Sequence, residues 1–350
     1  MKIGEIKNGM PVTISPSSPN EHILLVGTSG SGKSTRIAEM LADCVKRHET
    51  VIVIDVNGSD FCNDDGQKNV ISAVEDGLNL SLLNMVSMLN KKEGYIDFIS
   101  YIVECFSAIA NLGVRQMGVL REAIAYGIEH YNEYESDMAA IADGLCLQDS
   151  PIAAGVYNKI WNLLQCPVFK HNAKQMEKGT LNVISLRGIN SSTQKQIVEL
   201  LLLTIWRRCR LQGEDGSGLY IVLDEFQNLS LKKNSVLTEM LREARKYNVK
   251  LILSTQSIVA FPKEVMAAIS QTAVQLYFRQ SVSDVKKIAE FIDPQQKERW
   301  TLILKKLALG ESVAAGDFLV DGKEIHQPII IKSAFKKSSQ NHYEIKDRQC

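Results

Sequence analysis

Short runs of consecutive apolar residues alternate with segments of helical periodicity near the start of the chain. Residues 22–27 (HILLVG) and 51–56 (VIVIDV) are continuous apolar runs, the pattern of strands that are covered on both faces in a parallel sheet. A helical pattern follows the first run and continues to about residue 47. Strand, helix and strand in this order form a βαβ unit, so the two strands should run parallel.

This alternation stops after the second run and resumes near residue 181. Between residues 59 and 180, apolar residues recur at helical spacing and strand patterns nearly vanish. The acidic stretch Glu133, Glu135 and Asp137 within this part is expected to be a solvated helix face. Further strands are predicted over 181–186, 219–225, 249–255 and 273–278, each separated from the next by helix-like sequence. Two short strands, over 312–319 and 328–332, follow them.

The pattern as a whole predicts an α/β protein with a mainly parallel sheet between two layers of helices. Its core would comprise residues 20–57 and 181–331, and residues 58–180 would be inserted as an all-helical subdomain. We expect residues 332–350, rich in Lys, Ser, Gln and Asn, to form a flexible tail.

Residues 1–19 form a separate N-terminal segment. Two short alternating runs flank Asn8 and Gly9, a dipeptide that favours a tight hairpin turn. Pro11 lacks a backbone N–H and should confine the hairpin to a sheet edge.

Composition excludes several classes of protein. The 350 residues are 45% hydrophobic and 23% charged, so a disordered, collagen-like or disulfide-scaffold chain is excluded. The 7 Cys are odd in number and form no CxxC pair, which favours reduced thiols. The 40 basic and 40 acidic residues give no net charge, whereas proteins built around nucleic acid often have a basic excess.

The chain shows no integral membrane segment. Its longest apolar run, residues 197–206, is interrupted by Glu199 and is shorter than the ~20 residues that a membrane span needs. The N-terminal residues have no uninterrupted apolar region of the kind found in secretion signals. The expected location is the cytoplasm.

A phosphate-binding loop is the strongest chemical signal. The pattern G-x-x-x-x-G-K-[ST] is matched without deviation between a predicted strand and a predicted helix. Glycines there let successive N–H groups surround phosphates at the helix N-terminus, Lys33 would reach the β- and γ-phosphates, and the Ser34 hydroxyl would bind Mg²⁺. The candidate nucleotide-binding residues are Gly27, Thr28, Ser29, Gly30, Ser31, Gly32, Lys33, Ser34 and Thr35.

Two adjacent acids end the strand predicted over residues 219–225. Ligands of open α/β sheets bind at the carboxyl ends of strands, where Asp224 and Glu225 would lie. Asp224 is then the partner of Ser34 in holding Mg²⁺, and Glu225 is placed to polarise an attacking water as general base. The alternative for Asp224 is a capping residue for the next helix.

The acid pair favours hydrolysis over phosphate transfer, because a nucleotide kinase has no reason to direct a base at water. The chain has no NKxD pattern for reading guanine and no LSGGQ-like segment of transporter ATPases. Gln256 ends the strand predicted over residues 249–255 and suits a sensor that touches both γ-phosphate and water, although an isolated Gln at a strand end carries little information.

Two arginines are candidates for stabilising the negative charge that builds on the γ-phosphate. Arg245 lies on the helix before the sensor strand, and Arg279 follows the strand 273–278. Such an arginine comes from the same or a neighbouring subunit and accelerates the reaction by ~10³–10⁵. Either residue could instead be a surface charge or a salt-bridge partner.

These motifs together resemble a known superfamily. In this order, VGTSGSGKST, VIVIDVNGSD, IVLDEFQNL, LREARKYNVKLILSTQS and LYFR are similar to the HerA/FtsK superfamily of P-loop ATPases, which includes conjugation and type IV secretion ATPases. The resemblance covers about 20–57 and 181–331 and is weak over the insert. It implies a RecA-like fold with a helical insertion, a homohexameric ring with ATP at subunit interfaces, and DNA or protein moved through the pore.

The resulting hypothesis is a Mg²⁺-dependent ATP hydrolase that acts as a DNA translocase or helicase-type motor. One alternative is a conjugation or type IV secretion ATPase whose partner is a protein channel. Another is an ATP-operated assembly partner of a nuclease or defence effector. DNA stimulation of turnover would distinguish the first hypothesis from the second.

Overall fold

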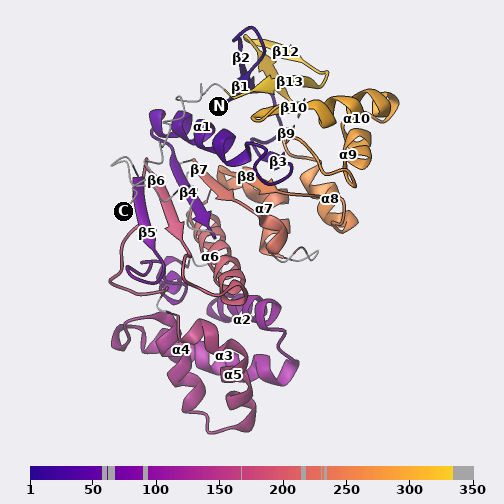
Figure 1. The fold of residues 1–350 in the computed structure, drawn as a ribbon. Helices are drawn as coiled ribbons and strands as arrows, with labels where there is room; N and C mark the ends of the chain where they lie inside the picture. Colours follow the sequence, from indigo (N-terminus) through magenta and orange to yellow (C-terminus); the bar gives the residue numbers. More distant parts are fainter. Residues whose placement is uncertain are drawn as a thin grey trace, which may run out of the picture.

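A parallel sheet forms the centre of the computed structural model, which describes residues 1–56, 61, 68–89, 94–166, 168–213, 218–229, 231 and 235–333 (Figure 1). Its strand order is β9-β3-β8-β7-β4-β6-β5, and each neighbouring pair is parallel. The strands are β3 (Ile23–Val26), β4 (Thr50–Asp55), β5 (Lys68–Ser72), β6 (Leu181–Ser185), β7 (Leu219–Leu223), β8 (Val249–Thr255) and β9 (Val274–Tyr277). The α/β fold with a mainly parallel sheet is confirmed.

An antiparallel extension continues the sheet beyond β9, in the order β10-β13-β1-β2-β11-β12. Its strands are β1 (Lys2–Glu5), β2 (Pro11–Ile14), β10 (Glu311–Gly316), β11 (Phe318–Val320), β12 (Lys323–Ile325) and β13 (Ile329–Lys332). Strands from both ends of the described chain therefore lie side by side, and β1 pairs with β13.

Two predictions for this extension were wrong in detail. The hairpin of β1 and β2 is present, but β2 also pairs with β11 and is not an edge strand. Pro11 is tolerated because it is the first residue of β2, where a missing N–H costs least. The strand predicted over residues 312–319 is two strands, because Gly316 at the end of β10 has a φ of 109°, which turns the chain before β11 begins.

Helices cover both faces of the parallel sheet. Alternate residues of β3 point to opposite faces: Ile23 and Leu25 pack with α1, whereas Leu24 and Val26 belong to the core under α6, α7 and α8. The helices of this domain are α1 (Lys33–Lys46), α6 (Ser191–Gln212), α7 (Val236–Glu243), α8 (Lys263–Ile269), α9 (Val285–Ile292) and α10 (Lys297–Lys306). The layers agree with the predicted arrangement of a sheet between helices.

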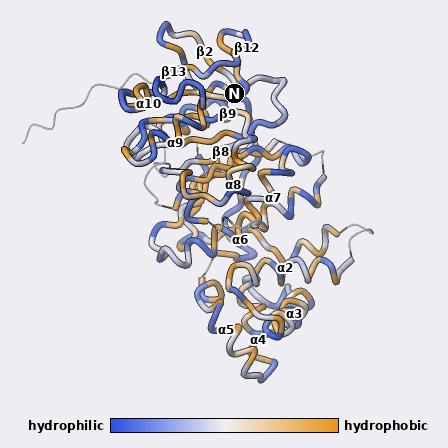
Figure 2. Tube along the Cα trace, turned by 90° about the vertical axis from the view of Figure 1, so that its right-hand side faces the viewer, coloured by the Kyte–Doolittle hydropathy of each residue, from blue (hydrophilic) through white to orange (hydrophobic). Residues whose placement is uncertain are grey.

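A helical subdomain lies beyond one end of the sheet domain, next to α6 (Figure 1). Its helices are α2 (Tyr95–Ala110), α3 (Val114–Glu129), α4 (Asp137–Cys146) and α5 (Pro151–Leu164). Figure 2 shows hydrophobic positions recurring along α6 and α2, and both helices contribute to one continuous core. None of the described helices is both long and apolar enough to span a bilayer.

The segment predicted to be entirely helical contains a strand. β5 pairs in parallel with β6 at the sheet edge, and its residues alternate between buried and half-buried. Five residues with one buried face leave too short a pattern to detect in the sequence. The predicted boundary at residues 57–58 and most of the predicted tail, residues 334–350, lie outside the described residues.

The prediction that Asp137 lies on a solvated helix face was wrong. Its side chain is fully buried. Its carboxylate accepts hydrogen bonds from Ser81 Oγ (2.7 Å) and from the backbone N–H groups of Leu82 (2.6 Å) and Leu83 (3.2 Å), and it pairs with His171 Nε2 at 3.0 Å. A buried carboxylate needs several such donors to offset its lost hydration. Asp137 thus joins α4 to the segments before and after the helical subdomain.

A buried histidine precedes β3, and it makes stability depend on pH. His22 is 2% exposed, and its Nδ1 accepts a hydrogen bond from the backbone N–H of Leu251 at 3.0 Å. Burial lowers the pKa of the His22 imidazole from 6.5 to about 4, and Glu21 offsets only part of this shift. Since the unfolded chain takes up this proton first, the free energy of unfolding should fall by up to about 3 kcal/mol as the pH drops from above 6.5 to about 4.

Urea unfolding at several pH values tests this expectation against His22→Gln. Glutamine keeps an acceptor for the Leu251 N–H but has no proton to gain in this pH range. The wild-type protein should therefore lose more stability on acidification than the variant does. Parallel losses in the two proteins would contradict the assignment.

Candidate active site

Residues 27–32 connect β3 to α1 as a loop that is fixed from both sides. Gly27 N donates to Thr255 O of β8 (3.2 Å), and Thr28 N donates to Arg279 O beyond β9 (3.0 Å). Gly32 precedes α1 with a φ of 106°, a conformation that side-chain-bearing residues rarely adopt. The loop backbone is therefore held at the carboxyl edge of the sheet, at the N-terminus of a 14-residue helix.

Lys33 projects back into this loop. Its Nζ donates to Gly27 O (2.7 Å) and Thr28 O (3.3 Å), and the residue is 6% exposed. Burial lowers the pKa of its ammonium group, whereas the charges of Glu225 and Asp224 act to raise it. Ser31 Oγ is buried without a hydrogen-bond partner among the described residues. A cation and an unsatisfied hydroxyl in one loop suit the phosphates of a nucleotide.

Asp224 and Glu225 follow β7, two strands away from β3. Leu223 pairs with Leu253, so the two acids are level with the last residues of β8. Neighbouring strands lie ~4.8 Å apart, so β3 and β7, with β8 between them, are separated by about 10 Å. This distance is enough for a phosphate group and a water molecule. Burial raises the pKa of the Asp224 carboxyl above its usual value. A bound cation would offset this cost, and carboxylate and hydroxyl oxygens such as those of Asp224 and Ser34 suit Mg²⁺.

Glu225 has a strained backbone and both of its carboxylate oxygens engaged. Its φ of 52° lies in the left-handed region, which costs a non-glycine residue roughly 1–2 kcal/mol. Gln256 Nε2 donates to Glu225 Oε1 at 3.0 Å, so the structure brings these two predicted site residues together. Gln227 Nε2 donates to Glu225 Oε2. Strained residues of this kind are concentrated at functional sites.

Gln227 is a site residue that the sequence did not indicate. Its side-chain oxygen accepts a hydrogen bond from Thr255 Oγ1 of β8 at 2.6 Å, so it bridges β8 and Glu225. A Gln two positions after an acid pair carries no signal by itself. Its role becomes visible only when β8 is known to lie beside β7.

The two candidate arginines lie at opposite ends of the parallel strands, which we call the carboxyl edge and the amino edge of the sheet. Arg279 follows β9 at the phosphate-loop edge, where its carbonyl oxygen also accepts a hydrogen bond from Thr28 Oγ1 (3.1 Å), and its side chain is exposed. Arg245, also exposed, precedes β8 at the amino edge and lines a 290 Å³ cavity with Glu21 and Lys250. Arg245 thus cannot reach the phosphate loop of its own chain.

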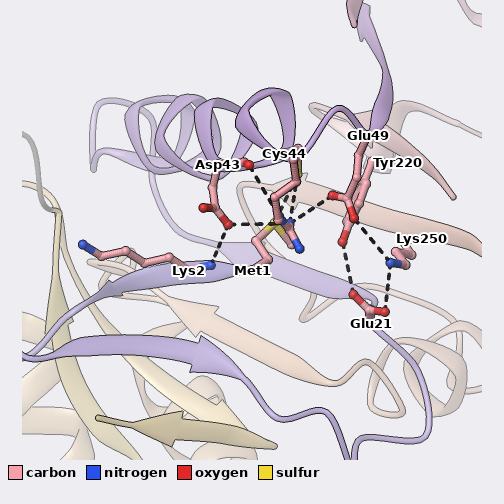
Figure 3. Close-up of polar contacts among 9 residues, drawn as sticks. Met1, Lys2, Glu21, Asp43, Cys44, Glu49, Tyr220 and Lys250 are labelled. Atoms are coloured by element: carbon pink, nitrogen blue, oxygen red, sulfur yellow. Dashed lines mark hydrogen bonds and ion pairs between the residues drawn. The ribbon is translucent and has the colours of Figure 1, made fainter. Parts of the chain in front are cut away.

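A polar cluster holds the strand starts together at the amino edge (Figure 3). Glu21, before β3, accepts a hydrogen bond from Tyr220 Oη (3.1 Å) and pairs with Lys250 Nζ (2.9 Å). Lys250 also lies 4.9 Å above the Tyr220 ring and 3.9 Å from Glu49. The cluster fixes β3, β7, β8 and β4 against one another beside Arg245.

Arg36 is a second residue that the sequence did not single out. Although it lies on α1, its side chain is fully buried and donates to Ile3 O (2.6 Å) and Gly310 O (3.0 Å). Gly310 N in turn donates to Ser31 O at 3.1 Å. Burial lowers the pKa of the Arg36 guanidinium to about 10. Arg36 therefore links the phosphate-loop helix to β1 and to the turn before β10.

A crevice of about 530 Å³ extends from the acid pair toward the N-terminus of α6. Its lining includes Asp224, Glu225 and Gln227, which follow β7, and Ser191 and Lys195 of α6. Ser191 and Lys195 are exposed. Glu225 and Gln227 are thus accessible from this crevice.

A parallel sheet with this loop, lysine and acid pair at its carboxyl edge defines a P-loop ATPase with a RecA-like fold. The chain belongs to the family described as the central domain of helicase HerA, whose model matches residues 1–205. The predicted kinship with HerA-like P-loop ATPases is confirmed.

Individual relatives agree with this assignment. The chain is 21% identical over 355 aligned residues to the DNA double-strand break repair helicase HerA of Saccharolobus solfataricus. This alignment covers 95% of this chain and 68% of the relative. Its fold is similar to that of VirB4 from Thermoanaerobacter pseudethanolicus, with a TM-score of 0.69, 14% identity and coverage of 96% of both chains. The bacterial conjugative coupling protein TrwB matches with a TM-score of 0.61 and 14% identity, covering 90% of this chain and 85% of that one.

Proposed function

We propose that this protein is a Mg²⁺-dependent ATP hydrolase that moves DNA, a translocase or helicase-type motor that works as a homohexameric ring in the cytoplasm. The observation that carries the proposal is the convergence of the phosphate loop, Lys33, Glu225 and Gln256 at one edge of the sheet. The similarity to a helicase named for DNA double-strand break repair supports DNA as the substrate.

In this proposal each part of the site has one task. The N–H groups of residues 29, 30 and 32–34 and the Lys33 ammonium bind the β- and γ-phosphates. Asp224 and Ser34 would hold Mg²⁺, which when bound neutralises developing charge on the phosphates. Glu225 takes a proton from the attacking water, and Gln256 positions that water against the γ-phosphate.

We assign the two arginines to different subunits of the ring. Arg279, beside the phosphate loop, would act on the nucleotide of its own chain. Arg245, at the opposite sheet edge, would act on the nucleotide of the next subunit, since a head-to-tail ring brings opposite edges together. ATP would then lie at the subunit interfaces.

We also propose a division of the chain into four parts. The segment 1–19 and the core of 20–57 and 181–331 would form the motor domain, with 58–180 as the inserted subdomain and 332–350 as a flexible tail. A nuclease or a secretion-channel protein is the partner class to search for.

The proposal is tested by measuring ATP hydrolysis with and without single- and double-stranded DNA, together with the mass of the protein in solution. We expect turnover that requires Mg²⁺ and rises with DNA, and a species of ring size in the presence of Mg-ATP. Hydrolysis that is indifferent to DNA would favour the alternative of a conjugation or secretion ATPase coupled to a protein channel. A monomer in every nucleotide state would contradict the ring.

A further inference from the structure

The general base is held by two amides at once. Gln227 Nε2 donates to one carboxylate oxygen of Glu225 and Gln256 Nε2 to the other, the latter at 3.0 Å. A carboxylate activates water by accepting one of its protons, so its lone pairs must point at the water. Here one lone pair on each oxygen accepts from an amide, which fixes the direction of the carboxylate and leaves fewer lone pairs for water.

Of the two amides, Gln227 is the one with a fixed orientation. Thr255, which is fully buried, donates its Oγ1 proton to the side-chain oxygen of Gln227 at 2.6 Å, the nearer of its two acceptors, since Ser257 O lies at 3.1 Å. With that oxygen occupied, the Gln227 NH₂ group must face Glu225. Gln256, by contrast, is exposed and its only hydrogen bond among the described residues is the one to Glu225.

We propose that Gln227 is a positioning residue that restrains Glu225 in the resting enzyme, and that nucleic acid entering the adjacent crevice releases it. The inference rests on the proposed function, in which Glu225 activates water. Glu225 has a φ of 52°, in the strained left-handed region. A strained backbone of this kind favours a second, relaxed conformation of Glu225.

The crevice supplies the route for release. Gln227 and Glu225 line the 530 Å³ space together with the exposed Lys195 and Ser191 of α6. A phosphodiester drawn to Lys195 would lie within reach of Gln227 and compete for its amide protons. Occupancy by DNA would thereby free Glu225 and couple substrate binding to hydrolysis.

Gln227→Met keeps the side-chain length but removes the donor, and Thr255→Val removes the anchor of Gln227 without a change in shape. Loss of one hydrogen bond corresponds to about a fivefold change in rate. We therefore expect DNA-free turnover to rise about fivefold in either variant, with the DNA-stimulated rate unchanged, so that the stimulation ratio falls by the same factor. Affinity for a non-hydrolysable ATP analogue should stay the same.

Gln148→Met is the matched control. Like that of Gln227, its amide donates hydrogen bonds, in this case to the backbone oxygens of Val119 (2.9 Å) and Gly144 (3.0 Å), but it lies in the helical subdomain. It should leave the stimulation ratio at the wild-type value. A DNA-free rate that falls or stays unchanged in both Gln227→Met and Thr255→Val would overturn the restraint.

Glu225→Gln, assayed in parallel, separates this inference from the function on which it rests. If Glu225→Gln is inactive while Gln227→Met keeps the wild-type ratio, the restraint alone is wrong. If Glu225→Gln retains full turnover, both the catalytic assignment and the restraint are wrong. A raised DNA-free rate in Gln227→Met together with an inactive Glu225→Gln supports both.

Discussion

Replacing Glu225 by Gln is expected to lower ATP turnover by ~10²–10⁴, the range that a positioned general base contributes. Glutamine has nearly the same shape and can keep one of the two hydrogen bonds from Gln256 and Gln227 through its carbonyl oxygen, so the local fold should be preserved. It cannot accept a proton from water. Nucleotide binding should remain, because the phosphate loop and Lys33 are untouched.

Steady-state hydrolysis and calorimetric binding of a non-hydrolysable ATP analogue measure the two parts of this prediction. Glu264→Gln is a suitable control, since it makes the same chemical change on exposed surface of α8. Full turnover in Glu225→Gln would show that another group activates the water. Loss of nucleotide binding in that variant would instead assign Glu225 to the binding of phosphates or metal.

The arginine prediction has the larger expected effect. Removing an arginine that neutralises the transferring phosphate lowers turnover by ~10³–10⁵. The structure places Arg245 at the amino ends of the parallel strands and Arg279 at their carboxyl ends, beside the phosphate loop. A ring made only of Arg245→Ala chains should therefore be inactive, because every nucleotide would lack the arginine of the neighbouring subunit.

Mixing variants distinguishes the two positions. In an equal mixture of Arg245→Ala and Glu225→Gln chains, about a quarter of the interfaces of a head-to-tail ring combine an intact Glu225 with an intact Arg245, so activity should return to about that fraction. A mixture of Arg279→Ala and Glu225→Gln chains should stay inactive, because those residues act on the same chain's nucleotide. Recovery in the second mixture but not in the first would reverse the assignment.

Local motifs of the site could be read directly from the chain. The run Gly27 to Ser34 lies between an apolar strand and a helix, and its function depends on covalently adjacent residues. The acid pair 224–225 at the end of β7 has the same local character. For these residues, the local sequence determines the local conformation, since a loop and the helix that follows it form from neighbours in sequence.

Other features depend on which strands lie side by side. β8 lies between β3 and β7, and only this order brings Thr255 and Gln256 to Glu225 and gives Gln227 its anchor. The same holds for Arg36, which resembles a surface charge on α1 until β1 and Gly310 cover it, and for β5, which is too short to be recognised without β6.

The division between the two kinds of feature has a single physical reason. Backbone conformation within a loop or strand follows from local sterics and hydrophobic periodicity, which every segment carries in its own residues. Strand order, the burial of Arg36 and Asp137, and the placement of Arg245 and Arg279 at opposite edges follow from packing between segments far apart in sequence. Such contacts are selected by the free energy of the whole folded core, and no single segment contains that information.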